Sequence, residues 1–261
     1  MPLLAWIIIF TAVGGLLSAL AASMFLVAPE RLRARVLPHL VSFATGALLG
    51  AALLGLLPHA IEAAGSVDVH EIGLTLLCGL LVFFVLEKLV LWRHCHFDLC
   101  EGHLPHDHNH GRDAASASLI LIGDGFHNVL DGVLIAAAFM TDVHLGIVTA
   151  IAVTAHEIPQ EVGDLAILLH GGMSRSRALT LNLLTSVTSV LGGIVAYFLL
   201  ADVTPLLPYA LAIAASSFLY IAVADLIPGL HRRVDPGSGV KQFVFIVMGV
   251  AVIYVSHRIA H

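Results

Sequence analysis

Two groups of metal-ligand side chains interrupt successive apolar runs of this 261-residue chain. The first group reads His127-Asn-Val-Leu-Asp131, and the second reads His156-Glu-Ile-Pro-Gln-Glu161. Ionisable side chains in hydrocarbon cost roughly 2.5–3.5 kcal/mol each on insertion scales, so their repeated presence calls for a function. Imidazole and carboxylate groups are ligands of divalent cations such as Zn²⁺. The two groups therefore predict a path for a divalent metal through a membrane.

Helical spacing brings the members of each group together. His127 and Asp131 are four residues apart, as are His156 and Gln160, so each pair shares one face of a helix. Both groups lie near the middle of their apolar runs. Two such faces turned toward each other would supply nitrogen and oxygen ligands near the membrane midplane. The alternative is a buried polar network that only joins two helices.

Smaller features of the same runs concern helix packing. Pro159 removes one backbone hydrogen bond and is expected to kink its helix. Gly132 and Gly163 are expected to let neighbouring backbones approach beside the ligands. Ser186, Thr188 and Ser189 are interpreted as residues that form helix–helix hydrogen bonds.

The chain is too apolar for a soluble protein. Hydrophobic residues make up 59% of it and charged residues 11%, against about 25% charged residues in soluble domains. A membrane-spanning helix needs about 20 mostly apolar residues. Eight such runs occur, at 3–27, 37–61, 71–92, 116–140, 144–170, 177–201, 204–227 and 239–258. The sequence therefore predicts an all-α fold, a single transmembrane domain over residues 1–261 built as a polytopic bundle of eight helices.

Basic residues orient this bundle. Every Lys and Arg except Arg258 lies in or beside the segments that follow the first, third, fifth and seventh runs. Cytoplasmic loops carry the excess of Lys and Arg, so both termini are expected outside the cytoplasm, and the short loops favour a bacterial inner membrane. The formal net charge of −6 gives no reason to expect a nucleic-acid partner. The expected partners are divalent metal ions and the lipid bilayer, and a homodimer is left open.

A His-rich segment at 93–113 follows the third run, on the predicted cytoplasmic side. Its ligand-type residues are His94, Cys95, His96, Cys100, His103, His106, His108 and His110. Zn²⁺ favours imidazole and thiolate, but the spacing matches no fixed zinc-finger pattern. Weak, multivalent metal capture is predicted, and the alternative is a polar linker without an essential ligand.

Ionisable residues near the ends of other runs mark a candidate entrance and exit. His59 and Glu62, at the outer end of the second run, are three residues apart and are interpreted as guides for an entering cation. Asp164, His170 and Asp225 lie toward the predicted cytoplasmic side and are candidate exit ligands. The alternative for His59, Glu62 and Asp225 is a polar cap at a helix end.

The sequence HNVLDG followed by HEIPQEVGD resembles the signature of the ZIP family, the zinc- and iron-regulated-type divalent-metal transporters. The resemblance covers the whole chain, with eight helices, both termini outside and a His-rich cytoplasmic loop between the third and fourth helices. It implies a ZIP-like bundle with Zn²⁺ as transported substrate and no cofactor.

The resemblance also implies a transport site. Its residues would be His127, Asn128, Asp131, His156, Glu157, Gln160 and Glu161. Family members often hold two adjacent metals there. Gln160 stands where the family motif often has His, which would loosen the preference for zinc. The run 177–201 lacks a carboxylate that some bacterial members use.

The predicted function is movement of a divalent cation into the cytoplasm, zinc first and Fe²⁺, Mn²⁺ or Cd²⁺ as further substrates, without enzymatic activity. Two alternatives stay open. An intramembrane zinc metalloprotease would explain His156-Glu157 as the start of an HExxH motif, although Gln160 stands where the second His is required. A membrane metal sensor would use the His-rich segment, but it leaves the midplane ligands unexplained.

Overall fold

The computed structural model describes residues 2–65, 68–95, 110–170, 172–201, 203–231 and 236–260. Within these ranges the chain is almost entirely helical, and no strand occurs. A backbone inside lipid has no water to bond with, so an apolar chain satisfies its N–H and C=O groups within helices. The prediction of an all-α helical bundle is confirmed.

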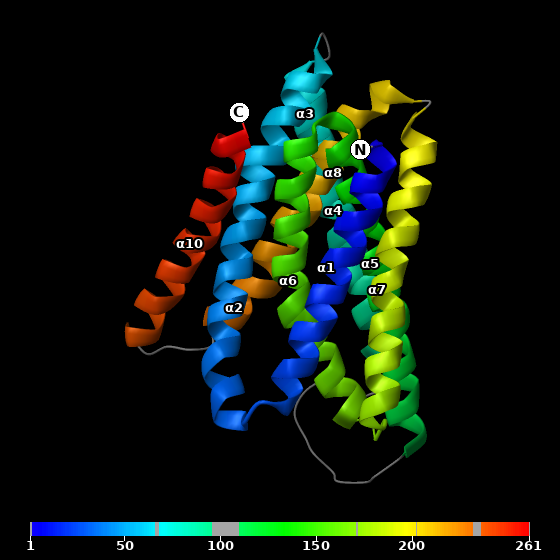
Figure 1. Ribbon diagram of the computed structural model, residues 1–261, viewed down its shortest axis with the longest axis vertical. Helices are drawn as coiled ribbons and strands as arrows, with labels where there is room; N and C mark the ends of the chain where they lie inside the picture. The colour runs from blue at the N-terminus through cyan, green and yellow to red at the C-terminus, as the bar shows by residue number, and fades with distance from the viewer. Residues whose placement is uncertain are drawn as a thin grey trace.

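The helices run up and down the bundle (Figure 1). They are α1 (Leu3–Val27), α2 (Glu30–Gly50), η1 (Ala51–Leu56), α3 (Leu57–Ala64), α4 (Val69–Cys95), α5 (His110–Thr141), α6 (Val143–His170), α7 (Arg175–Ala201), η2 (Thr204–Leu206), α8 (Leu207–Tyr220), η3 (Ile221–Leu226), α9 (Ile227–His231) and α10 (Pro236–Ala260). Both chain ends lie at the same end of the bundle, which we call the terminal end (Figure 1). The opposite end, where α4 ends and α5 begins, is the loop end.

Seven helices in the described part of the chain are long and apolar enough, by length and composition, to cross a membrane. One of them joins α2, η1 and α3, and another joins α8, η3 and α9. α6 has 28 residues but is not one of the seven, since its second half carries the ionisable group that begins at His156. Ionisable residues at membrane depth face the inside of a bundle, and α6 packs against α1, α2 and α5. The described part of the chain thus holds seven helices that qualify as membrane crossings and an eighth of similar length, α6, whose first half is apolar and whose second half carries ionisable residues.

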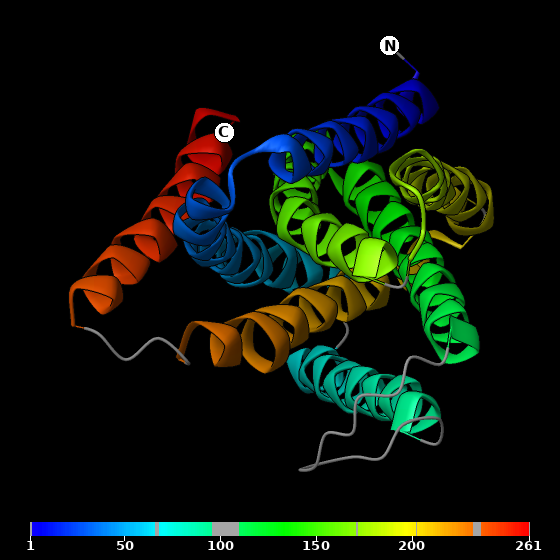
Figure 2. The same ribbon diagram turned by 90° about the horizontal axis from the view of Figure 1, so that it is seen from below.

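The helices form two groups of neighbours. In the first group, α1, α5, α6 and α7 pack against one another. The second group consists of α2, α4, α8 and α10, in which α2 packs against α10 and α8, and α4 packs against α8. Figure 2, seen along the bundle, shows α10 and α4 at its periphery and α6 near its centre. The two helices that carry the predicted transport site, α5 and α6, therefore belong to the first group.

Glycines bring α5 and α7 into close contact. A Cβ atom on Gly132 would lie 1.9 Å from the carbonyl oxygen of Ser189, and one on Gly192 would lie 2.2 Å from that of Val129. Neither position can hold a larger side chain unless the helices separate. The expectation for Gly132 is therefore confirmed. The same expectation for Gly163 is wrong, because no described atom lies within 4 Å of a Cβ placed there.

Two helices contain a wider turn just before a proline. η1 and η3 are π-helical segments, and they are followed by Pro58 and Pro228. In each, the residue before the proline donates its N–H five residues back, to the carbonyl of Ala52 or of Ala222. A proline removes a donor and crowds the carbonyl four residues earlier, so a wider turn relieves the clash. Asp225 lies within η3.

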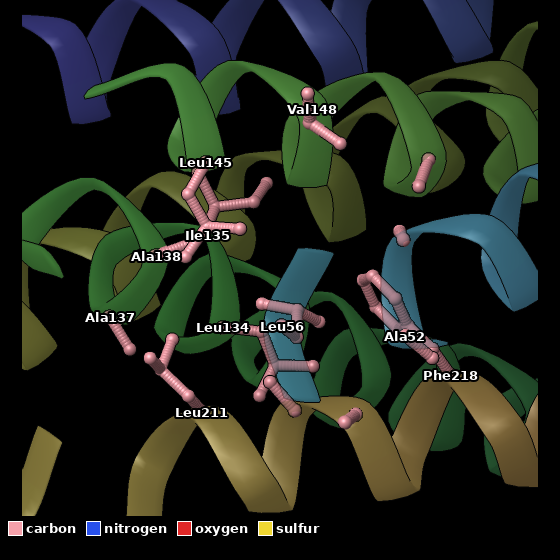
Figure 3. Close-up of a cluster of buried hydrophobic side chains, with 14 of the residues drawn as sticks. Ala52, Leu56, Leu134, Ile135, Ala137, Ala138, Leu145, Val148, Leu211 and Phe218 are labelled. Carbon is pink, nitrogen blue, oxygen red and sulfur yellow. The ribbon is translucent and has the colours of Figure 1, made fainter. Parts of the chain in front are cut away.

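The main apolar core fills the space between α5, α6, α8 and the η1 segment. Figure 3 shows Leu56, Leu134, Val148 and Phe218 converging from these elements, and all four are buried. Along α5 the core residues follow the predicted ligands, and along α6 they precede them. The core therefore lies on the terminal side of the predicted metal site.

Candidate metal centre

Four of the predicted ligands meet between α5 and α6. Each of His127, Asp131, His156 and Glu157 offers one ligand atom, and these atoms all lie within 4.8 Å of one another. Three of the residues are buried, and the side chain of His127 is 23% exposed. We call these four residues the four-ligand cluster. It is the one group of this kind among the described residues.

The separations within the cluster match the size of a bound zinc ion. The Nε2 atoms of His127 and His156 are 3.3 Å apart. The Oδ2 atom of Asp131 lies 3.3 Å from Nε2 of His156 and 3.7 Å from Nε2 of His127. The Oε1 atom of Glu157 lies 3.6 and 3.8 Å from the same two nitrogens. A tetrahedral Zn²⁺ with bonds of about 2.0–2.1 Å separates its ligand atoms by about 3.3 Å.

The four-ligand cluster contains carboxylates and nitrogen lone pairs but too few hydrogen-bond donors to pair with them. The Nδ1 atom of His156 lies 3.2 Å from the carbonyl oxygen of Ala152, and an N–H on that nitrogen leaves the lone pair of Nε2 facing the cluster. Both oxygens of Asp131 and both of Glu157 are buried and have no hydrogen-bond partner among the described residues. Buried carboxylates without donors are costly, so this arrangement favours a bound cation.

Asn128 and Gln160 are not members of the four-ligand cluster as defined, and their amides bind a residue that was not predicted from the sequence. Asn128 Nδ2 donates to Asp124 Oδ1 at 3.0 Å, and Gln160 Nε2 reaches the same oxygen at 3.4 Å. Asp124 is 5% exposed. It lies four residues before Asn128 in the same apolar run. An ionisable residue within an apolar run was the signal that identified Asp131, and the same signal could have identified Asp124.

Glu161 is also outside the cluster, although it lies one helical turn after Glu157. Its Oε1 atom accepts hydrogen bonds from Ser186 Oγ at 2.8 Å and from Ser18 Oγ at 3.2 Å. Its Oε2 atom accepts a hydrogen bond from Asn182 Nδ2. The prediction that Ser186 bonds between helices is confirmed, as it is for Thr188, whose hydroxyl donates to the carbonyl of residue 125 in α5 at 2.8 Å. Ser18 and Asn182 were not singled out, since single polar residues in long apolar runs carry little signal.

The candidate entrance residues lie on α3, near the terminal end. His59 Nδ1 lies 2.9 Å from the carbonyl oxygen of Gly55, and the His59 ring meets the ring of His257 edge-on at a centroid distance of 5.4 Å. Glu62 is exposed. Neither residue contacts the four-ligand cluster, so their guiding role stays a prediction.

Two of the candidate exit residues lie on the loop side of the cluster. Asp164 follows the ligands along α6, toward the loop end. Asp225 lies in η3, in the second half of the crossing Leu207–His231. Carboxylates are therefore present on the loop side of the cluster, opposite the apolar core.

The remaining predicted ligands cannot be placed. The side chain of His170 and those of His94, Cys95 and His110 at the ends of α4 and α5 lie outside the described part of the chain. So do the other predicted ligands of the segment, His96, Cys100, His103, His106 and His108. Their metal-binding roles stay predictions.

Comparison with known proteins gives one family. The family model described as ZIP zinc transporter matches residues 3–119 and 93–257. Zinc transporter zipt-7.1 of Caenorhabditis briggsae is 28% identical over 96% of this chain and 78% of its own length. Zinc transporter ZIP13 of Pongo abelii is 31% identical over 83% of this chain and 65% of its own length.

A human relative extends the comparison. Zinc transporter ZIP5 of Homo sapiens is 30% identical over 87% of this chain, and the matched region spans 53% of that protein. The chain thus covers from about half to about four fifths of these relatives. The family model spans nearly the whole chain, and the motif that carried the resemblance supplies the four-ligand cluster. The chain belongs to the ZIP zinc transporter family.

Proposed function

We propose that this protein moves a divalent metal cation, Zn²⁺ first, across the membrane into the cytoplasm through the four-ligand cluster. One observation carries the proposal: two buried carboxylates without donors face two imidazoles at the spacing of zinc ligands. The names of the relatives, all zinc transporters, support the same cargo.

The ligand set suits a doubly charged cargo. Asp131 and Glu157 together would neutralise the two charges of the ion, and the two imidazoles would replace part of its hydration shell. Such mixed nitrogen and oxygen sites also bind other first-row divalent ions. Fe²⁺, Mn²⁺ and Cd²⁺ are therefore proposed as weaker substrates.

The surroundings of the cluster favour release toward the loop end. The apolar core lies on the terminal side, while the carboxylates of Asp124, Asp164 and Asp225 would offer oxygen ligands on the loop side. The distribution of Lys and Arg supports a cytoplasmic loop end. The helix group that contains α5 and α6 would carry the metal past the group that contains α2 and α10.

Uptake of Zn²⁺ into proteoliposomes tests this proposal. The variants are His156→Ala and Asp131→Ala, and the matched control is His70→Ala, which removes an exposed imidazole far from the cluster in sequence. We expect both cluster variants to lose more than about 90% of uptake, because a missing ligand weakens a metal site by at least about tenfold. The control is expected to keep wild-type uptake.

Two results would contradict the proposal. One is the absence of uptake by folded wild-type protein in a vesicle that holds its pH gradient and membrane potential. The other is full uptake by His156→Ala protein. Loss of uptake in the His70→Ala control would mean that the assay reports protein damage, so the folded state of each variant is checked by gel filtration.

A further inference from the structure

Glu161 belongs to the transport motif by sequence, yet its carboxylate faces other helices than the metal ligands do. We propose that Glu161 is a positioning residue that joins α6 to α1 and α7 and thereby aims His156 and Glu157 at α5. This inference rests on the proposed function, because it concerns the same transport site. It replaces the expectation that Glu161 binds the metal.

Three donors from two other helices lie at this carboxylate, which has about four acceptor positions. Ser186 and Asn182 come from α7, and Ser18 comes from α1. Glu161 is fully buried, and Asn182, Ser18 and Ser186 are also buried. A buried carboxylate is stable only when its oxygens are hydrogen-bonded or paired with a cation. Glu161 meets that requirement without a metal, whereas Glu157 does not.

The position of Glu161 on α6 lets it control the ligands. It is four residues after Glu157, so the two side chains differ by about 40° around the helix axis. A rotation of α6 that removes Glu157 from the cluster would therefore also pull Glu161 from its donors. One turn further along, Leu165 packs with Ala22 of α1 and Ala178 of α7 in a second apolar cluster. The hydrogen bonds and this cluster together fix α6 against α1 and α7.

The partner Asn182 makes the proposal testable by exchanging donor and acceptor. Its Oδ1 atom is buried and has no hydrogen-bond partner among the described residues. If residue 161 becomes Gln, the Asn182 amide can turn so that Oδ1 accepts from the new amide. The Glu161→Gln change therefore preserves the helix contact but removes the negative charge that a carboxylate ligand would supply to the metal.

The experiment compares Glu161→Gln, Asn182→Asp and the double variant Glu161→Gln/Asn182→Asp. The double variant moves the carboxylate from α6 to α7 and keeps one donor–acceptor pair. The matched control is Glu157→Gln, the same chemical change one turn earlier. Each protein is measured for yield, for KM and Vmax of Zn²⁺ uptake, and for the visible absorption spectrum of bound Co²⁺.

We expect Glu161→Gln to stay within about threefold of wild type in KM, with an unchanged Co²⁺ spectrum. Asn182→Asp sets two carboxylates against each other and should lower Vmax or yield by about tenfold. The double variant should regain wild-type values to within about threefold, since coupled pairs restore each other. Glu157→Gln should change the Co²⁺ spectrum and lose uptake, with no recovery on adding Asn182→Asp.

The proposal is overturned if Glu161→Gln loses uptake and alters the Co²⁺ spectrum as Glu157→Gln does, because Glu161 is then a ligand. It is also overturned if the double variant is no better than Asn182→Asp in both yield and uptake. Failure of wild-type protein to take up Zn²⁺ contradicts the proposed function instead. The Co²⁺ spectra and yields still test the role of Glu161 in that case.

Discussion

Glu157 and Glu161 lie one turn apart on the same helix, and both are buried, yet their surroundings differ. Glu157 faces two imidazoles and Asp131, and neither of its oxygens accepts a hydrogen bond from a described residue. Glu161 accepts hydrogen bonds from three side chains on α1 and α7. Residue type marks both glutamates as parts of a polar site in a membrane helix, and they differ in the number of hydrogen-bond donors that surround each carboxylate.

The largest expected effect is the loss of metal binding on removing a carboxylate that has no donor. Glu157→Ala should weaken Zn²⁺ binding in detergent by more than about 100-fold, since it removes a ligand and one of two neutralising charges. Isothermal titration calorimetry measures the change. The matched control is the exposed Glu62→Ala, which should leave binding unchanged. Wild-type affinity in Glu157→Ala protein would erase the distinction between the two glutamates.

Acid should affect the four-ligand cluster strongly because protons compete with the metal for the same atoms. Ligation requires neutral imidazoles and ionised carboxylates, so each proton that a ligand holds must leave before the metal binds. As the pH falls, Zn²⁺ affinity should therefore decrease by up to about tenfold per pH unit for each proton displaced. Titrations between pH 5 and 8 measure this slope, and an affinity that does not change across that range would contradict the ligand set.

Glycine substitutions sharpen the contrast between helix contact and open space. Gly132→Ala would drive a methyl group into the carbonyl of Ser189 and should destabilise the protein by about 1–3 kcal/mol through overpacking. Gly163→Ala meets no neighbour and should be neutral or stabilising by up to about 1 kcal/mol, because Ala favours helix. Thermal unfolding in detergent compares the two. Equal effects would mean that α5 and α7 are not in close contact at Gly132.

The smallest effect is expected from the His-rich segment. Replacing residues 96–109 by a Gly and Ser linker of the same length leaves all members of the four-ligand cluster in place. We expect the rate of uptake to change by no more than about threefold, because only weak capture sites are removed. Initial rates in proteoliposomes measure the change. Complete loss of uptake would show that the segment takes part in transport itself.

The sequence by itself determined the membrane class, the helices and the identity of the ligand motif. A low fraction of charged residues and long apolar runs leave the backbone no alternative to helices in lipid. The spacing of His127 and Asp131 sets them on one helical face in any such fold. All four members of the cluster could therefore be named from the sequence.

Only the tertiary structure decided which motif residues face one another. Gln160 and Asn128 turn to Asp124, and Glu161 turns to α1 and α7. Side-chain spacing along one helix says nothing about which helix lies opposite, so Ser18 and Asn182 could not be identified as partners. The open space at Gly163 escaped prediction for the same reason, because contact between helices depends on packing that is remote in sequence.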